Sequence, residues 1–119
     1  MSTDSFRDLT RQTSARLGTL RASIPQTMKG FAELSRNAMA QGALDMKTKE
    51  LIALALGVAG HCDACIGYHT MALVKLGATR QELDETLGVA IYMGGGPSLM
   101  YAANAVASFD EFAAAAAQQ

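Results

Sequence analysis

Four side chains capable of redox, acid–base or metal chemistry lie within eleven residues, GHCDACIGYHT, numbered 60–70. They are His61, Cys62, Cys65 and His69, and the chain holds no other cysteine or histidine. On a helix, their spacing places Cys62, Cys65 and His69 on one face. The unpaired N–H groups and the dipole at a helix N-terminus stabilise a thiolate, and His69 lies within side-chain reach of Cys65 as a base. The segment therefore predicts a nucleophilic cysteine.

A carboxylate that could orient His69 comes from the preceding helical segment. Glu50 lies twelve residues before Cys62, about 18 Å along a helix. If the chain folds back at residues 60–61, His69 approaches Glu50 to within about 7 Å along the helix axis. The hairpin would then align Glu50, His69, Cys65 and Cys62 as carboxylate, base, nucleophile and second thiol. By spacing alone, Glu50 is equally well explained as a solvated charge.

The cysteine pair also admits structural and metal-binding interpretations. Cysteine is often simply a small buried apolar residue. The pattern C-x2-C-x3-H offers zinc three ligands, but structural zinc takes four, and the chain has no second pair of ligands. Haem attachment requires a histidine directly after the second cysteine, where Ile66 stands. We therefore expect no metal and no cofactor, and we rank redox chemistry above zinc binding.

Composition narrows the functional classes. The chain has 119 residues, of which 50% are hydrophobic and only 6% aromatic, a mixture that favours close-packed helices. The net charge is −1 and the basic residues are scattered, so we expect no nucleic-acid partner. The longest apolar run, residues 51–60, is too short to span a bilayer, and the N-terminal stretch has no apolar signal region. We expect a single cytoplasmic domain comprising residues 1–119.

Apolar residues recur at helical spacing throughout the chain, without a strand pattern or an internal repeat. Asp45 is a natural N-cap, Thr79 begins a capping box, and Gly42 and Gly77 suit the C-terminal ends of helices. The alanine-rich tail, residues 113–119, is expected to fray. The sequence thus predicts an all-α bundle of about six helices with a central hairpin carrying the CxxC motif. The predicted helices cover about 5–23, 25–42, 46–60, 62–76, 79–93 and 97–113.

The segment KELIALALGVAGHCDACIGYHT, residues 49–70, resembles the alkylhydroperoxidase AhpD-like core of the carboxymuconolactone decarboxylase family. The flanking phrases GALDMKTKELIALA, ALVKLGATRQELDETLGVA and YMGGGP are similar to the same family. The resemblance covers about residues 25–107. The signature E-x11-C-x2-C-x3-H is specific, and the match favours Glu50 as a functional carboxylate over Glu50 as a solvated charge.

This resemblance implies a thiol-dependent peroxidase or disulfide oxidoreductase with an all-helical fold. It implies that Cys65 becomes the sulfenic acid, that Cys62 is the proton donor and the disulfide partner, and that Glu50 and His69 form the activating relay. The implied partners are a hydroperoxide substrate and a lipoyl or thioredoxin-like dithiol as reductant. It further implies trimers or hexamers, which agrees with the several apolar helix faces that one small core cannot bury.

One position departs from the family pattern. Several peroxidase members carry a tyrosine before the second cysteine, where this chain has Ala64. His61 and Tyr68 flank the motif and are candidates for lining a substrate pocket. Two alternatives stay open: a lyase or isomerase acting on a small lactone through Glu50 and His69, and a non-catalytic redox sensor or assembly module. The family's lactone decarboxylases generally lack the cysteine pair, which counts against the first alternative.

Overall fold

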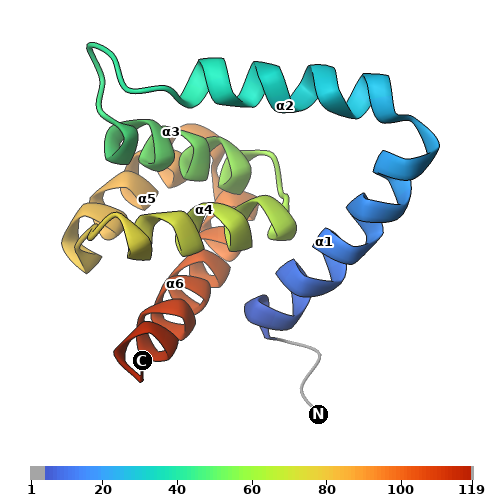
Figure 1. Ribbon diagram of the computed structural model, residues 1–119. Helices are drawn as coiled ribbons and strands as arrows, with labels where there is room; N and C mark the ends of the chain where they lie inside the picture. Colours follow the sequence, from blue (N-terminus) through green and yellow to red (C-terminus); the bar gives the residue numbers. More distant parts are fainter. Residues whose placement is uncertain (1–4, 119) are drawn as a thin grey trace.

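The computed structural model of the protein describes residues 5–118, which form six α-helices and no strand (Figure 1). In chain order the helices are α1 (Phe6–Ser23), α2 (Pro25–Met39), α3 (Met46–Ala59), α4 (Asp63–Lys75), α5 (Arg80–Gly94) and α6 (Gly96–Ala117). Helices α3 and α4 run antiparallel as a hairpin, with α5 and α6 packed against it. The predicted all-α bundle with a central hairpin is confirmed.

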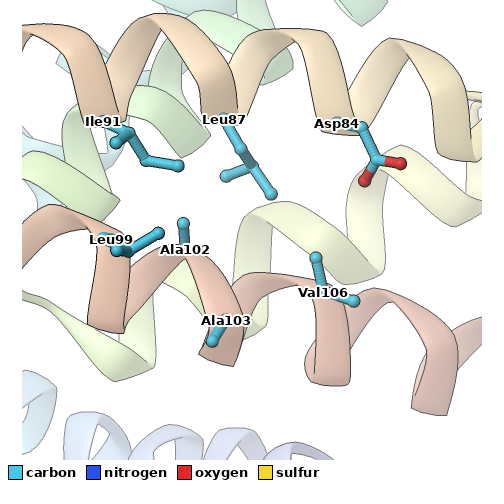
Figure 2. A pocket seen from close by; sticks show the side chains of 7 residues that line it. All are labelled: Asp84, Leu87, Ile91, Leu99, Ala102, Ala103 and Val106. Atoms are coloured by element: carbon cyan, nitrogen blue, oxygen red, sulfur yellow. The ribbon is translucent and has the colours of Figure 1, made fainter.

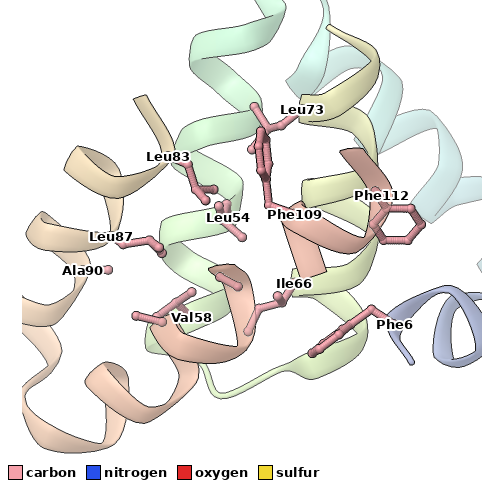
Figure 3. Packing of buried hydrophobic residues seen from close by; sticks show 12 residues of the cluster. Phe6, Leu54, Val58, Ile66, Leu73, Leu83, Leu87, Ala90, Phe109 and Phe112 are labelled. Atoms are coloured by element: carbon pink, nitrogen blue, oxygen red, sulfur yellow. The ribbon is translucent and has the colours of Figure 1, made fainter. Parts of the chain in front are cut away.

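The hydrophobic core lies where α3, α4, α5 and α6 meet (Figure 3). Leu54 of α3 and Ile66 of α4 are fully inaccessible to solvent, and both face this core. The hairpin is therefore held on its inner face by apolar packing, which fixes the two helices that carry the candidate site residues. The buried apolar residues of the cluster are Phe6, Leu54, Val58, Ile66, Leu73, Leu83, Leu87, Ala90, Ala102, Ala105, Phe109 and Phe112.

Helix α1 is fastened to the bundle mainly through its first turns. Ser5 is the N-cap, and its Oγ accepts the N–H of Asp8 at 3.2 Å. The carboxylate of Glu111 on α6 accepts three hydrogen bonds, from Ser5 Oγ and from the N–H groups of Phe6 and Arg7. A carboxylate at the N-terminus of a helix is favoured by the helix dipole as well as by these donors. Glu111 thus anchors α1 to the end of α6.

Helix α2 begins as expected but ends early. Pro25 occupies the first turn, where its missing N–H is not needed. The predicted C-terminal cap at Gly42 is wrong, because α2 ends at Met39. The Nζ of Lys49 on α3 accounts for this end: it donates to the carbonyl oxygens of Ala38 and Ala40 at 3.0 and 2.6 Å. A charged side chain from the next helix therefore satisfies carbonyls that would otherwise lack donors.

Helix α6 is longer than the sequence pattern predicted. The alanine run continues as helix to Ala117, so the expectation that the helix ends near residue 113 is wrong for the described residues, and Gln119 lies outside them. Alanine has the highest intrinsic helix propensity, which explains why the helix continues through residues that are at most half-buried. Within residues 5–118 no helix, this one included, has the length and hydropathy required to cross a membrane.

Candidate thiol site

The turn between α3 and α4 positions both cysteines. Gly60 caps α3, and the backbone then turns at His61, which has a positive φ of 57°. Cys62 follows as the N-cap of α4, and its N–H donates to the carbonyl oxygen of Gly57 at 3.0 Å. The sequence predicted the turn but not that histidine, rather than the adjacent Gly60, adopts the left-handed conformation.

Cys62 and Cys65 form a disulfide, with their Cα atoms 5.2 Å apart. The Sγ of Cys62 also accepts the N–H of Cys65 at 3.1 Å, which makes it the N-terminal cap of α4. Both residues are half-buried. The pair thus lies at the positive end of a helix dipole, where a thiolate would be stabilised once the disulfide is reduced.

The carboxylate and the base meet across the hairpin. His69 Nδ1 and Glu50 Oε1 are 2.6 Å apart, a short hydrogen bond between α4 and α3. The Glu50 side chain is 15% exposed and that of His69 is 30% exposed. Glu50 is therefore not a fully solvated charge, and it fixes the orientation of the imidazole. Because Nδ1 is engaged with Glu50, Nε2 is the ring nitrogen that can exchange a proton with another group.

His69 and Cys65 lie four residues apart on α4, on one face. Among residues 5–118, the hydrogen bonds of His69 do not include one to either sulfur in the disulfide state. The structure therefore joins Glu50 to His69 through a hydrogen bond and Cys62 to Cys65 through the disulfide. The link between these pairs stays a prediction for the reduced protein.

The two candidate pocket residues have different surroundings. His61 is exposed and stacks on Tyr101 of α6, with ring centroids 4.8 Å apart and planes inclined by 9°. The hydroxyl of Tyr68 donates to the carbonyl oxygen of Thr10 at 3.0 Å and lies 2.6 Å from Ser14 Oγ. Tyr68 therefore ties α4 to α1, and His61 ties the turn to α6. A role for either in lining a substrate pocket stays a prediction.

A polar contact next to the cysteines has no counterpart in the sequence pattern. Asp63, the first residue of α4, accepts a hydrogen bond from Asn104 Nδ2 on α6 at 3.1 Å. No local pattern links these residues, because they are forty-one positions apart and meet only through helix packing. The contact holds the N-terminal end of α4 against α6.

Two apolar cavities lie away from the thiols. One of about 270 Å³ opens between α5 and α6, with side chains from both helices pointing into it (Figure 2). Another of about 370 Å³ lies between α3 and α5. Neither is lined by Cys62, Cys65, His69 or Glu50. Among residues 5–118, no cluster of three or more histidine, cysteine and acidic side chains has the geometry to hold a metal ion.

Comparison with known proteins agrees with this architecture. Residues 25–108 match the model of the carboxymuconolactone decarboxylase family. An uncharacterized protein of Cupriavidus necator is 41% identical over 110 residues, covering 92% of this chain and 96% of that protein. A second, described as uncharacterized protein 4 in the cox locus of Paracoccus denitrificans, is 36% identical, covering 82% of this chain and 88% of that protein.

Solved structures of the same family share the fold. The crystal structure of apo-lpg0406, a carboxymuconolactone decarboxylase family protein from Legionella pneumophila, is similar with a TM-score of 0.89 and 56% identity, covering 91% of this chain and 96% of that one. TM1620 from Thermotoga maritima, a family protein described with a possible role in the antioxidative response, has a TM-score of 0.83 and 28% identity, covering 92% and 93% of the two chains. The chain therefore belongs to the carboxymuconolactone decarboxylase family.

Proposed function

We propose that this protein is a thiol-dependent peroxidase and disulfide oxidoreductase of the alkylhydroperoxidase type. The observation that carries the proposal is the 2.6 Å hydrogen bond between His69 and Glu50 beside a cysteine pair at a helix N-terminus. A carboxylate that orients an imidazole makes it an effective base, and a base near a thiol is the arrangement needed to generate a nucleophile. The Thermotoga maritima relative is described with a possible role in the antioxidative response, which agrees with peroxide reduction.

The oxidative half of the proposed cycle uses both thiols. Glu50, through His69, keeps Cys65 deprotonated. The Cys65 thiolate attacks the distal oxygen of a hydroperoxide; an S–O bond forms, the O–O bond breaks, and Cys62 supplies the proton with which the alcohol leaves. The Cys62 thiolate then attacks the sulfenic acid of Cys65; an S–S bond forms, the S–O bond breaks, and the oxygen leaves as water with the proton that His69 took from Cys65.

The reductive half needs an external dithiol of the lipoyl or thioredoxin type. One of its thiolates attacks the Cys62–Cys65 disulfide and forms a mixed disulfide, which its second thiol then resolves. The two cysteines regain their protons and electrons, and the dithiol leaves as a disulfide. This chemistry fits a reducing compartment, and we propose the cytoplasm as the location.

We further propose that the active form is a homo-oligomer, a trimer or a hexamer. Helix α2 contributes no residue to the core, and its Phe31 and Leu34 are 67% and 62% exposed. A helix of this length is marginal without tertiary packing. A second copy of the chain that covers this face would supply that packing.

Peroxide consumption with dihydrolipoamide or thioredoxin as the reductant tests the proposed activity. We expect turnover in the wild type, its loss in Cys65→Ser, and at most one turnover in Cys62→Ser, which cannot form the disulfide. Turnover that is unchanged in both variants would favour the lactone activity, in which the thiols take no part. Absence of turnover with either reductant would favour a redox sensor.

A further inference from the structure

Gly57 of α3 touches both cysteines. Its carbonyl oxygen accepts the N–H of Cys62 at 3.0 Å. A Cβ atom placed on Gly57 would lie only 3.2 Å from the Cβ of Cys65 and 3.8 Å from the backbone nitrogen of Ile66. A separation of 3.2 Å is closer than ordinary contact between such carbon atoms, so Cys65 must give way by a few tenths of an ångström when a methyl group is added. The absence of a side chain at Gly57 thus permits the approach of α4 at Cys65.

Two contacts therefore set the register of the hairpin at the thiol site. Gly57 meets Cys65, and seven residues earlier on α3 Glu50 meets His69. The seven residues from Gly57 to Glu50 span about 10.5 Å of α3, and the four from Cys65 to His69 span about 6 Å of α4. The side chains of Glu50 and His69 must therefore bridge the difference of about 4.5 Å along the axis. Their hydrogen bond is only 2.6 Å long, which leaves little freedom for the helices to separate.

We propose that Gly57 is a positioning residue for the thiol pair: it holds Cys65 at the depth in the hairpin where the His69–Glu50 pair can act on it. This proposal rests on the proposed function, since it assigns Gly57 to the relay that activates Cys65. Glycine is among the least favourable residues inside a helix, so helix stability alone favours alanine at this position. A loss of activity in Gly57→Ala would consequently come from the contact with Cys65 and not from a weaker helix.

Gly88 provides a matched control within the same chain. It lies inside α5, and a Cβ placed on it would meet no atom within 4 Å. Gly88→Ala adds the same methyl group and the same gain in helix propensity without crowding a neighbour. Any difference between the two variants at the thiols therefore reports the contact of residue 57 with Cys65.

The test measures helicity and thiolate absorbance as a function of pH. Titrations are made in the Cys62→Ser background, where Cys65 alone reports. We expect both alanine variants to keep the helicity of their parent. Gly57→Ala should raise the pKa of Cys65 by about half a unit or more, whereas Gly88→Ala should leave it unchanged. With both cysteines present, Gly57→Ala should also lower the rate of disulfide formation by peroxide several-fold.

The outcomes separate this proposal from the proposed function. Coincident titrations of Gly57→Ala, Gly88→Ala and their parent would overturn the positioning role, even with full peroxidase turnover. Loss of helicity in Gly57→Ala would also overturn it, because Gly57 would then serve the fold alone. A shifted Cys65 titration in Gly57→Ala, together with a wild type that consumes no peroxide, would refute the peroxidase and support the positioning role.

Discussion

Glu50 and His69 come from different helices and meet across the α3–α4 hairpin. Helical spacing gave an axial gap of about 7 Å, to be closed by two side chains, and the structure closes it with one hydrogen bond of 2.6 Å. The stacking of His61 on Tyr101 could not be predicted in this way. It depends on how α6 lies against the hairpin, and periodicity within each helix carries no information on that packing.

The Glu50–His69 pair leads to a prediction about the Cys65 thiol. In the Cys62→Ser background, His69→Ala or Glu50→Gln should raise the pKa of Cys65 by about a unit or more, because the thiolate loses a favourable partner. A titration followed by thiolate absorbance measures this change directly. Superimposable curves for His69→Ala and its parent would show that no relay reaches Cys65.

Metal binding gives a second prediction at the residue scale. The motif supplies two cysteines and His69, one ligand short of a closed structural zinc site. The purified protein should therefore contain well under one equivalent of zinc, and a chelator should leave its circular dichroism unchanged. Stoichiometric zinc whose removal unfolds the chain would reverse the ranking of redox chemistry over metal binding.

At the scale of elements, the helix starts were more predictable than the helix ends. Asp45 and Thr79 cap α3 and α5 as expected, and Thr79 forms the full capping box with Glu82. These signals are local, because the capping side chain lies within three residues of the N–H that it accepts. The end of α2 depends instead on Lys49, which is nine residues beyond the carbonyl of Ala40 and belongs to another helix.

The anchoring of α1 by Glu111 should depend on pH. Partial burial raises the pKa of this carboxyl group, but the hydrogen bonds from Ser5, Arg7 and Phe6 outweigh it and hold the pKa below its ordinary value of 4.5. A carboxylate with a depressed pKa in the folded state contributes stability above the ordinary value, and this contribution is lost as the pH falls through the depressed value.

Glu111→Gln should therefore lower the free energy of unfolding by about 1 kcal/mol at pH 7, since it removes charge-assisted hydrogen bonds to α1. The difference from wild type should shrink in acid, where Glu111 is protonated. Urea denaturation at neutral and acidic pH measures both effects, with Glu33→Gln on the exposed surface of α2 as the control. An equal loss of stability in the two variants would contradict the anchoring role.

At the scale of the whole molecule, apolar side chains remain exposed outside the core. Besides those of α2, Leu56 of α3 and Val89 of α5 are 68% and 63% exposed beside the larger cavity. No charged residue occurs between Glu85 and Asp110, so much of α5 and α6 is uncharged. Such surfaces are characteristic of interfaces, and the isolated chain offers nothing among its described residues to cover them.

We therefore expect sedimentation at micromolar concentration to detect a trimer or a hexamer rather than the 12.5 kDa chain. Leu34→Glu should shift the protein toward smaller species, because it places a charge in the exposed apolar face of α2. Gln26→Glu adds the same charge at a polar position of that helix and should leave the assembly intact. A monomeric wild type with full activity would refute the assembly.

In the proposed cycle, Cys65 reduces peroxide and thereby becomes a sulfenic acid. Mass spectrometry of the Cys62→Ser protein after one equivalent of hydroperoxide and a sulfenic-acid trapping reagent should detect this product, because a serine at position 62 cannot condense with it. We predict trapping at Cys65, slowed by His69→Ala and absent in Cys65→Ser. A Cys65 that remains an unmodified thiol while peroxide persists would refute the peroxidase mechanism.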